Sequence, residues 1–186
     1  MSKLFIRQVS ILLASITIVL VATDKVMSQS INQEEMVNTH NEWRQKVGSP
    51  PLQWSDELAQ IAQDWANYLA TQDGNISHRP NNRYGENIFW ISGKQALPSE
   101  VVNAWGSEVQ YFQNGIFPNV STTGKWYDVG HYTQVIWKNT TEVGCGVARS
   151  KKIEIWVCNY NPPGNYQGQN PHSFNLNGER SSVWGL

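Results

Sequence analysis

The two cysteines near the end of the chain restrict its fold more than any other sequence feature. If a hairpin turns at Lys151-Lys152, its register sets three pairs of residues opposite each other: Cys145 with Cys158, Val147 with Trp156, and Arg149 with Glu154. An apolar pair and a pair of opposite charges are what neighbouring strands favour. We therefore predict a Cys145–Cys158 disulfide across an antiparallel strand pair, worth about 3 kcal/mol because it closes a short loop. Two free, buried thiols are the alternative.

The N-terminal segment has the pattern of a signal peptide. Lys3 and Arg7 precede an apolar run at 9–22, which is too short to span a bilayer comfortably. A cleavage site after Ser28 predicts a signal peptide at 1–28, with an uncleaved anchor as the alternative. We expect the remaining chain, 29–186, to be a single secreted domain without a transmembrane anchor, extracellular or, in a bacterium, periplasmic. Such oxidising compartments permit the predicted disulfide.

Composition excludes two further classes of protein. The formal net charge is −1 and the charged fraction is 16%, without a run of Lys or Arg, so we expect no nucleic-acid partner. The aromatic fraction of 11% is too high for a disordered chain. A length of 186 residues, less the leader, suits one folded domain with a hydrophobic core.

The order of the predicted elements indicates an α+β fold. Three helices and three strands are expected: helices at 32–47, 55–71 and 99–112, and strands at 131–138, 143–149 and 153–160. The segments at 72–95 and 113–130 read as mixed and as a loop, and the tail from Pro162 is expected to wrap the domain without regular structure. Helices followed by strands are typical of layered α+β domains.

Polar residues interrupt this apolar pattern at a few positions. Glu108 shares a predicted helix face with Trp105 and Phe112, where a carboxylate is costly unless it is paired. Glu86 leads into an apolar segment, and His131 begins another. Each of these residues could be a structural hydrogen-bond anchor. If they met His78 in one cleft, they could instead hold a divalent metal or exchange protons, but their spacing alone does not bring them together.

Two longer motifs and three shorter ones resemble motifs of the CAP superfamily. This superfamily comprises cysteine-rich secretory proteins, antigen 5 and pathogenesis-related class 1 proteins. The longer motifs are GHYTQVIW at 130–137 and VCNYNPPGNY at 157–166. The shorter ones are His40-Asn41-x-x-Arg44, Gly85-Glu86-Asn87-Ile88 and Asn103-Ala104-Trp105-x-x-Glu108. The resemblance covers about 32–172 and is greatest to the pathogenesis-related class 1 branch and its bacterial secreted relatives.

This resemblance implies a three-layer α-β-α sandwich with a central cleft. In the family the cleft is lined by two histidines and two glutamates, which correspond to His78, Glu86, Glu108 and His131. It also implies that His78 and His131 are the direct ligands if Zn²⁺ or another divalent cation is bound. We expect such a cation to be held weakly. The chain departs from the family in having only the bridge that matches Cys145–Cys158.

The family resemblance leaves the function open, because one fold can serve several functions. We expect most an extracellular lipid- or sterol-binding module, with the aromatic segments Phe89-Trp90 and 111–117 as its apolar surface. Alternatives are an extracellular protein-interaction or defence-type effector without catalysis, a metal-dependent hydrolase, and a cleft that is only structural. Ser77 beside His78 lacks a nucleophile turn, so catalysis is less favoured and no catalytic residue is assigned.

Overall fold

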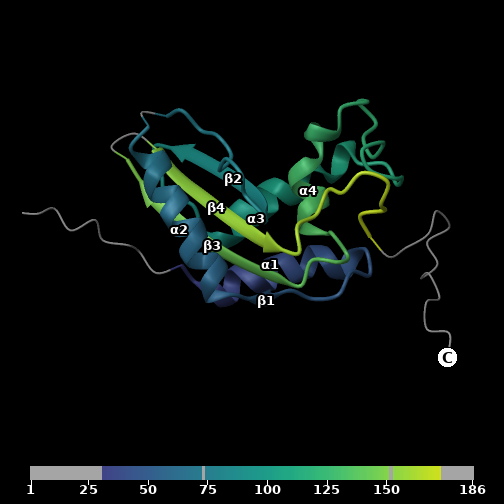
Figure 1. Cartoon of the computed structure of the whole chain (residues 1–186), viewed down its shortest axis with the longest axis horizontal. Helices are drawn as coiled ribbons and strands as arrows, with labels where there is room; N and C mark the ends of the chain where they lie inside the picture. The colour runs from purple at the N-terminus through teal and green to yellow at the C-terminus, as the bar shows by residue number, and fades with distance from the viewer. Residues whose placement is uncertain (1–30, 73, 151–152, 173–186) are drawn as a thin grey trace, which may run out of the picture.

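The computed structural model describes residues 31–72, 74–150 and 153–172 (Figure 1). The elements in chain order are α1 (Gln33–Lys46), β1 (Gln53–Trp54), α2 (Asp56–Ala70), β2 (Gly85–Ser92), α3 (Pro98–Gly106), the 3₁₀ helices η1 (Ser107–Tyr111) and η2 (Trp126–Asp128), α4 (Gly130–Val135), β3 (Glu142–Arg149) and β4 (Ile153–Asn161). The predicted signal peptide at 1–28 and the hairpin centre at Lys151-Lys152 lie outside the described residues.

The predicted hairpin register is confirmed. β3 and β4 pair antiparallel, and the pairs Cys145 with Cys158, Val147 with Trp156 and Arg149 with Glu154 lie opposite each other. Cys145 and Cys158 form a disulfide with their Cα atoms 4.1 Å apart. This hairpin is the centre of a four-stranded sheet with the order β1-β3-β4-β2.

Helix α2 forms a layer on one face of the sheet (Figure 1). Its buried residues Ala62, Ala66 and Leu69 pack against Ile155 and Val157 of β4. The helix follows the sequence prediction closely, because Ser55 caps it and the apolar residues recur along one face.

Two glycines of β3 let α2 approach the sheet. A Cβ atom on Gly144 would lie 2.2 Å from the Ala59 backbone nitrogen, and one on Gly146 would lie 2.3 Å from the Gln63 Cα. The Gln63 side chain donates to the carbonyl of Val147 at 2.8 Å and accepts from its amide at 3.1 Å. Close backbone contact therefore replaces side-chain packing along this stretch.

Helices α1, α3 and α4 cover the opposite face, which completes the predicted α-β-α sandwich. Met36, Trp105 and Val135, one from each helix, lie in the same core as the Cys145–Cys158 disulfide. The mixed fold class and its layers therefore agree with the sequence prediction.

Arg44 ties α1 to the end of α4 from inside the protein. Its guanidinium donates to the carbonyls of Pro50, Val135, Trp137 and Thr140 at 2.6–2.9 Å, and it is fully buried. Burial lowers the pKa of Arg44 to about 10, so the group remains charged at neutral pH. Charge-assisted bonds to the last carbonyls stabilise this helix end.

The predicted strand at 131–138 is wrong, because the structure has α4 there instead. Residues 132–137 are all buried, polar and apolar alike. Without an exposed face there is no periodicity to distinguish a strand from a buried helix. The Glu108 carboxylate accepts from the amides of His131 and Tyr132, both at 3.0 Å. These bonds satisfy amide groups in the first turn, which have no partner within the helix.

Two other segments also differ from prediction. The expected helix at 99–112 ends at Gly106 and continues as η1. A Cβ on Gly106 would lie 2.1 Å from the Trp43 ring, so the glycine allows α1 and α3 to pack closely. The mixed segment at 72–95 contains edge strand β2, and the short strand β1 was not expected.

The segment at 113–129 and the tail lie side by side (Figure 1). The Phe117 amide donates to the Gln169 carbonyl, and the Gly168 amide donates to the Phe117 carbonyl, both at 2.9 Å. The tail has no regular structure over the described part, 162–172, as predicted. Within the described residues, every helix is too short or too polar to cross a membrane.

Candidate functional site

The first polar pair of the site joins His78 to Glu86, which lies at the beginning of β2. His78 Nδ1 lies 2.8 Å from Glu86 Oε1, and the Glu86 side chain is only 4% exposed, whereas that of His78 is 66% exposed. Because the carboxylate accepts from Nδ1, the Nε2 atom is left for other partners. The Glu86 hydrogen bond raises the pKa of His78 above its ordinary value of 6.5.

Glu86 also anchors the loop that carries His78. Its carboxylate accepts from the Arg79 amide at 3.0 Å and from the side-chain amides of Asn82 and Asn159, each at 3.4 Å. Asn159 lies opposite Glu86 on β4. Glu86 is thus a buried anchor whose oxygens are occupied by donors from the loop and the sheet.

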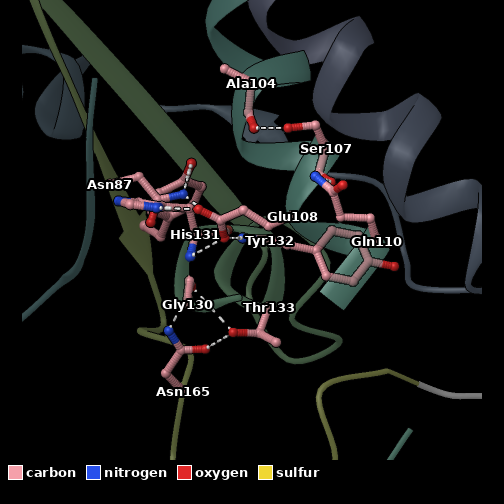
Figure 2. A network of polar contacts seen from close by, with 11 residues as sticks. Asn87, Ala104, Ser107, Glu108, Gln110, Gly130, His131, Tyr132, Thr133 and Asn165 are labelled. Atoms are coloured by element: carbon pink, nitrogen blue, oxygen red, sulfur yellow. Dashed lines mark hydrogen bonds and ion pairs between the residues drawn. The ribbon is translucent and has the colours of Figure 1, made fainter. Parts of the chain in front are cut away.

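The second polar pair joins His131 to Glu108 (Figure 2). His131 Nδ1 lies 2.6 Å from Glu108 Oε1, while Glu108 Oε2 accepts from the amides of His131 and Tyr132. The carboxylate therefore orients the imidazole and caps α4 at the same time. The Glu108 side chain is 20% exposed, so it lies behind His131 rather than deep in the core.

A cleft of about 530 Å³ lies at the end of the sheet where β2 begins, and we call it the central cleft. The residues that line it are His78, 84–87, 117–118, 126–127, 130–131, Gln134, 163–165 and Gln167. His78, Glu86 and His131, which come from three different segments, therefore face one hollow. Glu108 reaches this hollow only through its hydrogen bond to His131.

A buried network behind the cleft was not predicted as part of the site. His40 Nδ1 donates to the Met36 carbonyl at 2.8 Å, which leaves Nε2 to accept from the Tyr160 hydroxyl at 2.9 Å. The Asn87 amide donates to that hydroxyl and to the His131 carbonyl. The network therefore connects α1 to the residue that carries one cleft imidazole.

The motifs are the signals of this network in the sequence: the short ones contain His40 and Asn87, and the longer VCNYNPPGNY contains Tyr160. All three side chains are buried, and burial lowers the pKa of His40 to about 4. His40 is therefore neutral at pH 7, as its hydrogen bonds require. A polar residue within a helix or strand gives no indication of a partner so distant in sequence.

His78 and His131 are the candidate ligands for a divalent cation in the cleft. Each imidazole gives Nδ1 to a carboxylate, and no hydrogen bond among the described residues involves its Nε2. A metal-binding histidine commonly has its other ring nitrogen held by a carboxylate in this way. Within the described residues, no group of three or more His, Cys, Asp or Glu is placed to hold a metal ion. His78 and His131 would supply only two protein ligands, so water would have to complete the coordination shell.

The fold and the cleft define a class of protein: an α-β-α sandwich with two histidine–glutamate pairs at one end of its sheet. The sequence matches the profile of the Cysteine-rich secretory protein family over residues 37–160. The chain belongs to this CAP family.

Two plant proteins are similar to this chain over much of its length. Pathogenesis-related protein 1A of Nicotiana tabacum is 35% identical over 87% of this chain and 93% of its own length. Pathogenesis-related protein PR-1 of Medicago truncatula is 43% identical over 69% of this chain and 72% of its own length. These relatives agree with the predicted pathogenesis-related type.

A solved structure shares the fold. The crystal structure of NaASP2 with Zn²⁺ aligns with a TM-score of 0.64 over 80% of this chain and 88% of that one, at 24% identity. The similarity therefore extends through most of the sandwich.

Proposed function

We propose that this CAP-family protein is an extracellular recognition module that binds a partner in the central cleft without catalysing a reaction. The central observation is that His78 and His131 line one hollow, each held by a glutamate. Side chains held in this way lose little conformational freedom when a ligand binds. The relatives named as pathogenesis-related proteins are consistent with a defence-type effector.

The extracellular location is part of this proposal. The N-terminal leader pattern and the Cys145–Cys158 disulfide both suit export to an oxidising compartment. The description of the family as secretory is consistent with that route.

A divalent cation such as Zn²⁺ is an optional occupant, held by Nε2 of His78 and Nε2 of His131. A bound cation would add positive charge and attract an oxygen atom of a ligand. The two glutamates would orient the imidazoles through Nδ1 and would not themselves be ligands, since donors from the protein already occupy their oxygens.

Hydrolysis is less favoured by the geometry. Among the described residues, no hydroxyl group hydrogen-bonds to Nε2 of either histidine, so neither imidazole has a nucleophile to activate. Glu86 and Glu108 are both engaged as anchors, which leaves neither carboxylate free as a general base. We therefore assign no catalytic residue.

Lipid or sterol binding is the second candidate. Exposed aromatic rings favour it, because Trp126 and Tyr127 line the cleft and are 46% and 58% exposed. The apolar segments expected from the sequence give divided support: Trp90, Tyr111 and Ile116 are exposed. Phe117 is buried and Phe112 packs against the core. Extraction of the purified native protein with organic solvent and mass spectrometry would detect a bound sterol or fatty acid.

A capture experiment with cleft variants tests the main proposal. Wild type, a His78→Ala/His131→Ala double variant and a Trp90→Ala control would be immobilised and exposed to extracellular medium from the native source. Trp90 is 55% exposed and does not belong to the residues that line the cleft. We expect a component retained by wild type and the control but lost from the double variant. Equal retention by all three proteins would rule out recognition at the cleft.

A further inference from the structure

The chemistry of the cleft wall identifies a class of ligand, and this inference rests on the proposed recognition function. Trp126 and Tyr127 are consecutive residues of η2, and both line the cleft with substantial exposure. Single exposed aromatic rings also occur elsewhere on this surface, as at Trp90. Two that adjoin in one hollow form an apolar patch of the kind that marks a binding site.

These exposed rings are held in place from behind. The Trp126 ring packs edge-to-face against Phe117, with centroids 5.5 Å apart, and Phe117 is only 5% exposed. A Cβ on Gly130 would come within 3.3 Å of the Trp126 ring, so the glycine allows the ring to lie against the backbone of α4. Trp126 is therefore a fixed platform rather than a loose surface side chain.

Hydrogen-bonding groups without protein partners complete the cleft. Among the described residues, no hydrogen bond within the protein involves Nε2 of His78, Nε2 of His131 or the Gln167 amide. The Tyr127 hydroxyl and the Trp126 indole N–H add two further groups of this kind. Both donors and acceptors are thus available next to an aromatic face.

Charge limits the ligands that suit this wall. The described lining residues include no Lys, Arg or Asp, and the single glutamate, Glu86, is 4% exposed and occupied by protein donors. A phosphate or sulfate group would find no fixed cationic partner, since only the two imidazoles can gain a positive charge. An uncharged ligand rich in hydroxyl groups suits the cleft better.

The rim also disfavours an extended peptide. Peptides bound as added strands need free backbone groups. The Gly130 carbonyl already accepts from Asn165 at 2.9 Å and from Thr133 at 3.2 Å, and the Gly164 amide donates to Gln134 at 2.8 Å. These backbone groups of the rim are therefore unavailable for pairing.

We infer that the central cleft binds a neutral oligosaccharide. A pyranose ring has an apolar face of C–H groups, which stacks on an aromatic ring, and hydroxyl groups around its edge. One sugar unit would stack on Trp126 or Tyr127, while its hydroxyls bond to the His78 and His131 imidazoles and to Gln167. The volume of about 530 Å³ is within the usual range of small-ligand sites.

Isothermal titration of the full chain with cellohexaose, xylohexaose and chitohexaose tests this inference, in the presence of a chelator so that metal plays no part. We expect at least one of these sugars to bind wild type, with an affinity about tenfold lower for Trp126→Ala, as loss of one stacking contact implies. Tyr127→Ala provides a second variant at a more exposed site, and Trp90→Ala is the matched control, expected to bind like wild type.

Three results would overturn the oligosaccharide assignment. None of these sugars binds, or Trp90→Ala loses as much affinity as Trp126→Ala, or the cleft binds a sterol and no sugar. The capture experiment above separates this failure from failure of the proposed function. If the sugars do not bind but wild type retains a partner that the His78→Ala/His131→Ala variant loses, recognition stands and the ligand class is wrong. If both experiments fail, both proposals are wrong.

Discussion

At the scale of single residues, each cleft histidine works as half of a pair. Glu86 and Glu108 accept from Nδ1 of His78 and of His131, which leaves Nε2 of both imidazoles for other partners. The sequence suggested an alternative in which Glu108 is a structural anchor, and the bonds from Glu108 to the backbone support that role. Glu108 therefore has both roles, because the carboxylate that caps α4 also orients the His131 imidazole.

The pair arrangement predicts how a metal would bind. We expect Zn²⁺ to bind the wild-type protein weakly. Most of the heat of binding should be lost in His131→Ala, because one of the two protein ligands is removed. Since the hydrogen bond to Glu86 raises the pKa of His78 above 6.5, protons compete with the metal at higher pH than for a free histidine. Binding should therefore weaken as the pH falls through that raised pKa.

Calorimetry at several pH values measures this effect, with the exposed-acid variant Glu34→Gln as a control for nonspecific binding. Equal heats from wild type and His131→Ala would remove the metal site from the proposal. The sugar-binding inference would be unaffected, because it needs no metal and is tested with a chelator present.

At the scale of elements, α4 depends on residues from two other segments. Its first amides, from His131 and Tyr132, donate to Glu108 of η1, and its last carbonyl, from Val135, accepts from Arg44 of α1. A six-residue helix is too short to be stable alone, so partners at both ends fix it. This explains why a local reading of the sequence predicted a strand.

Replacement of the N-terminal partner should destabilise the protein. Glu108→Leu removes the acceptor of two amides and of the His131 side chain, and we expect a loss of about 2 kcal/mol in the free energy of unfolding. Glu108→Gln should lose less, because its amide oxygen can still accept. Chemical denaturation measures both changes.

Glu34→Leu is the matched control for that prediction, since Glu34 is exposed on α1 and should change stability by no more than about 0.5 kcal/mol. If Glu108→Leu and Glu34→Leu have the same effect, Glu108 does not anchor α4.

At the scale of the whole molecule, one buried network crosses the sandwich. It runs from His40 in α1 through Tyr160 of β4 and Asn87 of β2 to the backbone of His131 in α4. All of these side chains except that of His131 are buried, so the network depends on the protonation state of His40. A charged His40 would donate through Nε2 and oppose the Tyr160 hydroxyl.

This network predicts a loss of stability in acid. The pKa of His40 is about 4 in the folded protein and about 6.5 when unfolded, so the unfolded state binds more protons between these values. The stabilisation is complete above pH 6.5 and is lost as the pH falls through 4, a change of about 3 kcal/mol. His40→Gln should have a flatter profile of unfolding free energy against pH.

Denaturation series from pH 7 to pH 4 on wild type and His40→Gln would check this. His78 has the opposite effect, because its pKa is raised in the folded protein. Its contribution to stability is complete below about pH 6.5 and is lost as the pH rises through the raised pKa, and His78→Gln serves as the comparison. Parallel profiles for wild type and His40→Gln would contradict the assignment to His40.

The sequence by itself determined the parts of this protein that depend on nearby residues. The register of β3 against β4, the Cys145–Cys158 disulfide and the extent of α2 follow from strand pairing, a cap and a helical period, and the structure confirms all three. The family motifs added the sandwich and the residues of the cleft, as expectations that no local pattern could supply.

Only the tertiary structure decided how His78 and His131 come to face one hollow, because they lie in segments that the layers bring together over a long stretch of chain. It also decided that 130–135 is helical, since the stabilising contacts come from Glu108 and Arg44 in other elements. Short-range patterns encode the energy of neighbours, whereas these features depend on contacts that exist only after the layers have packed.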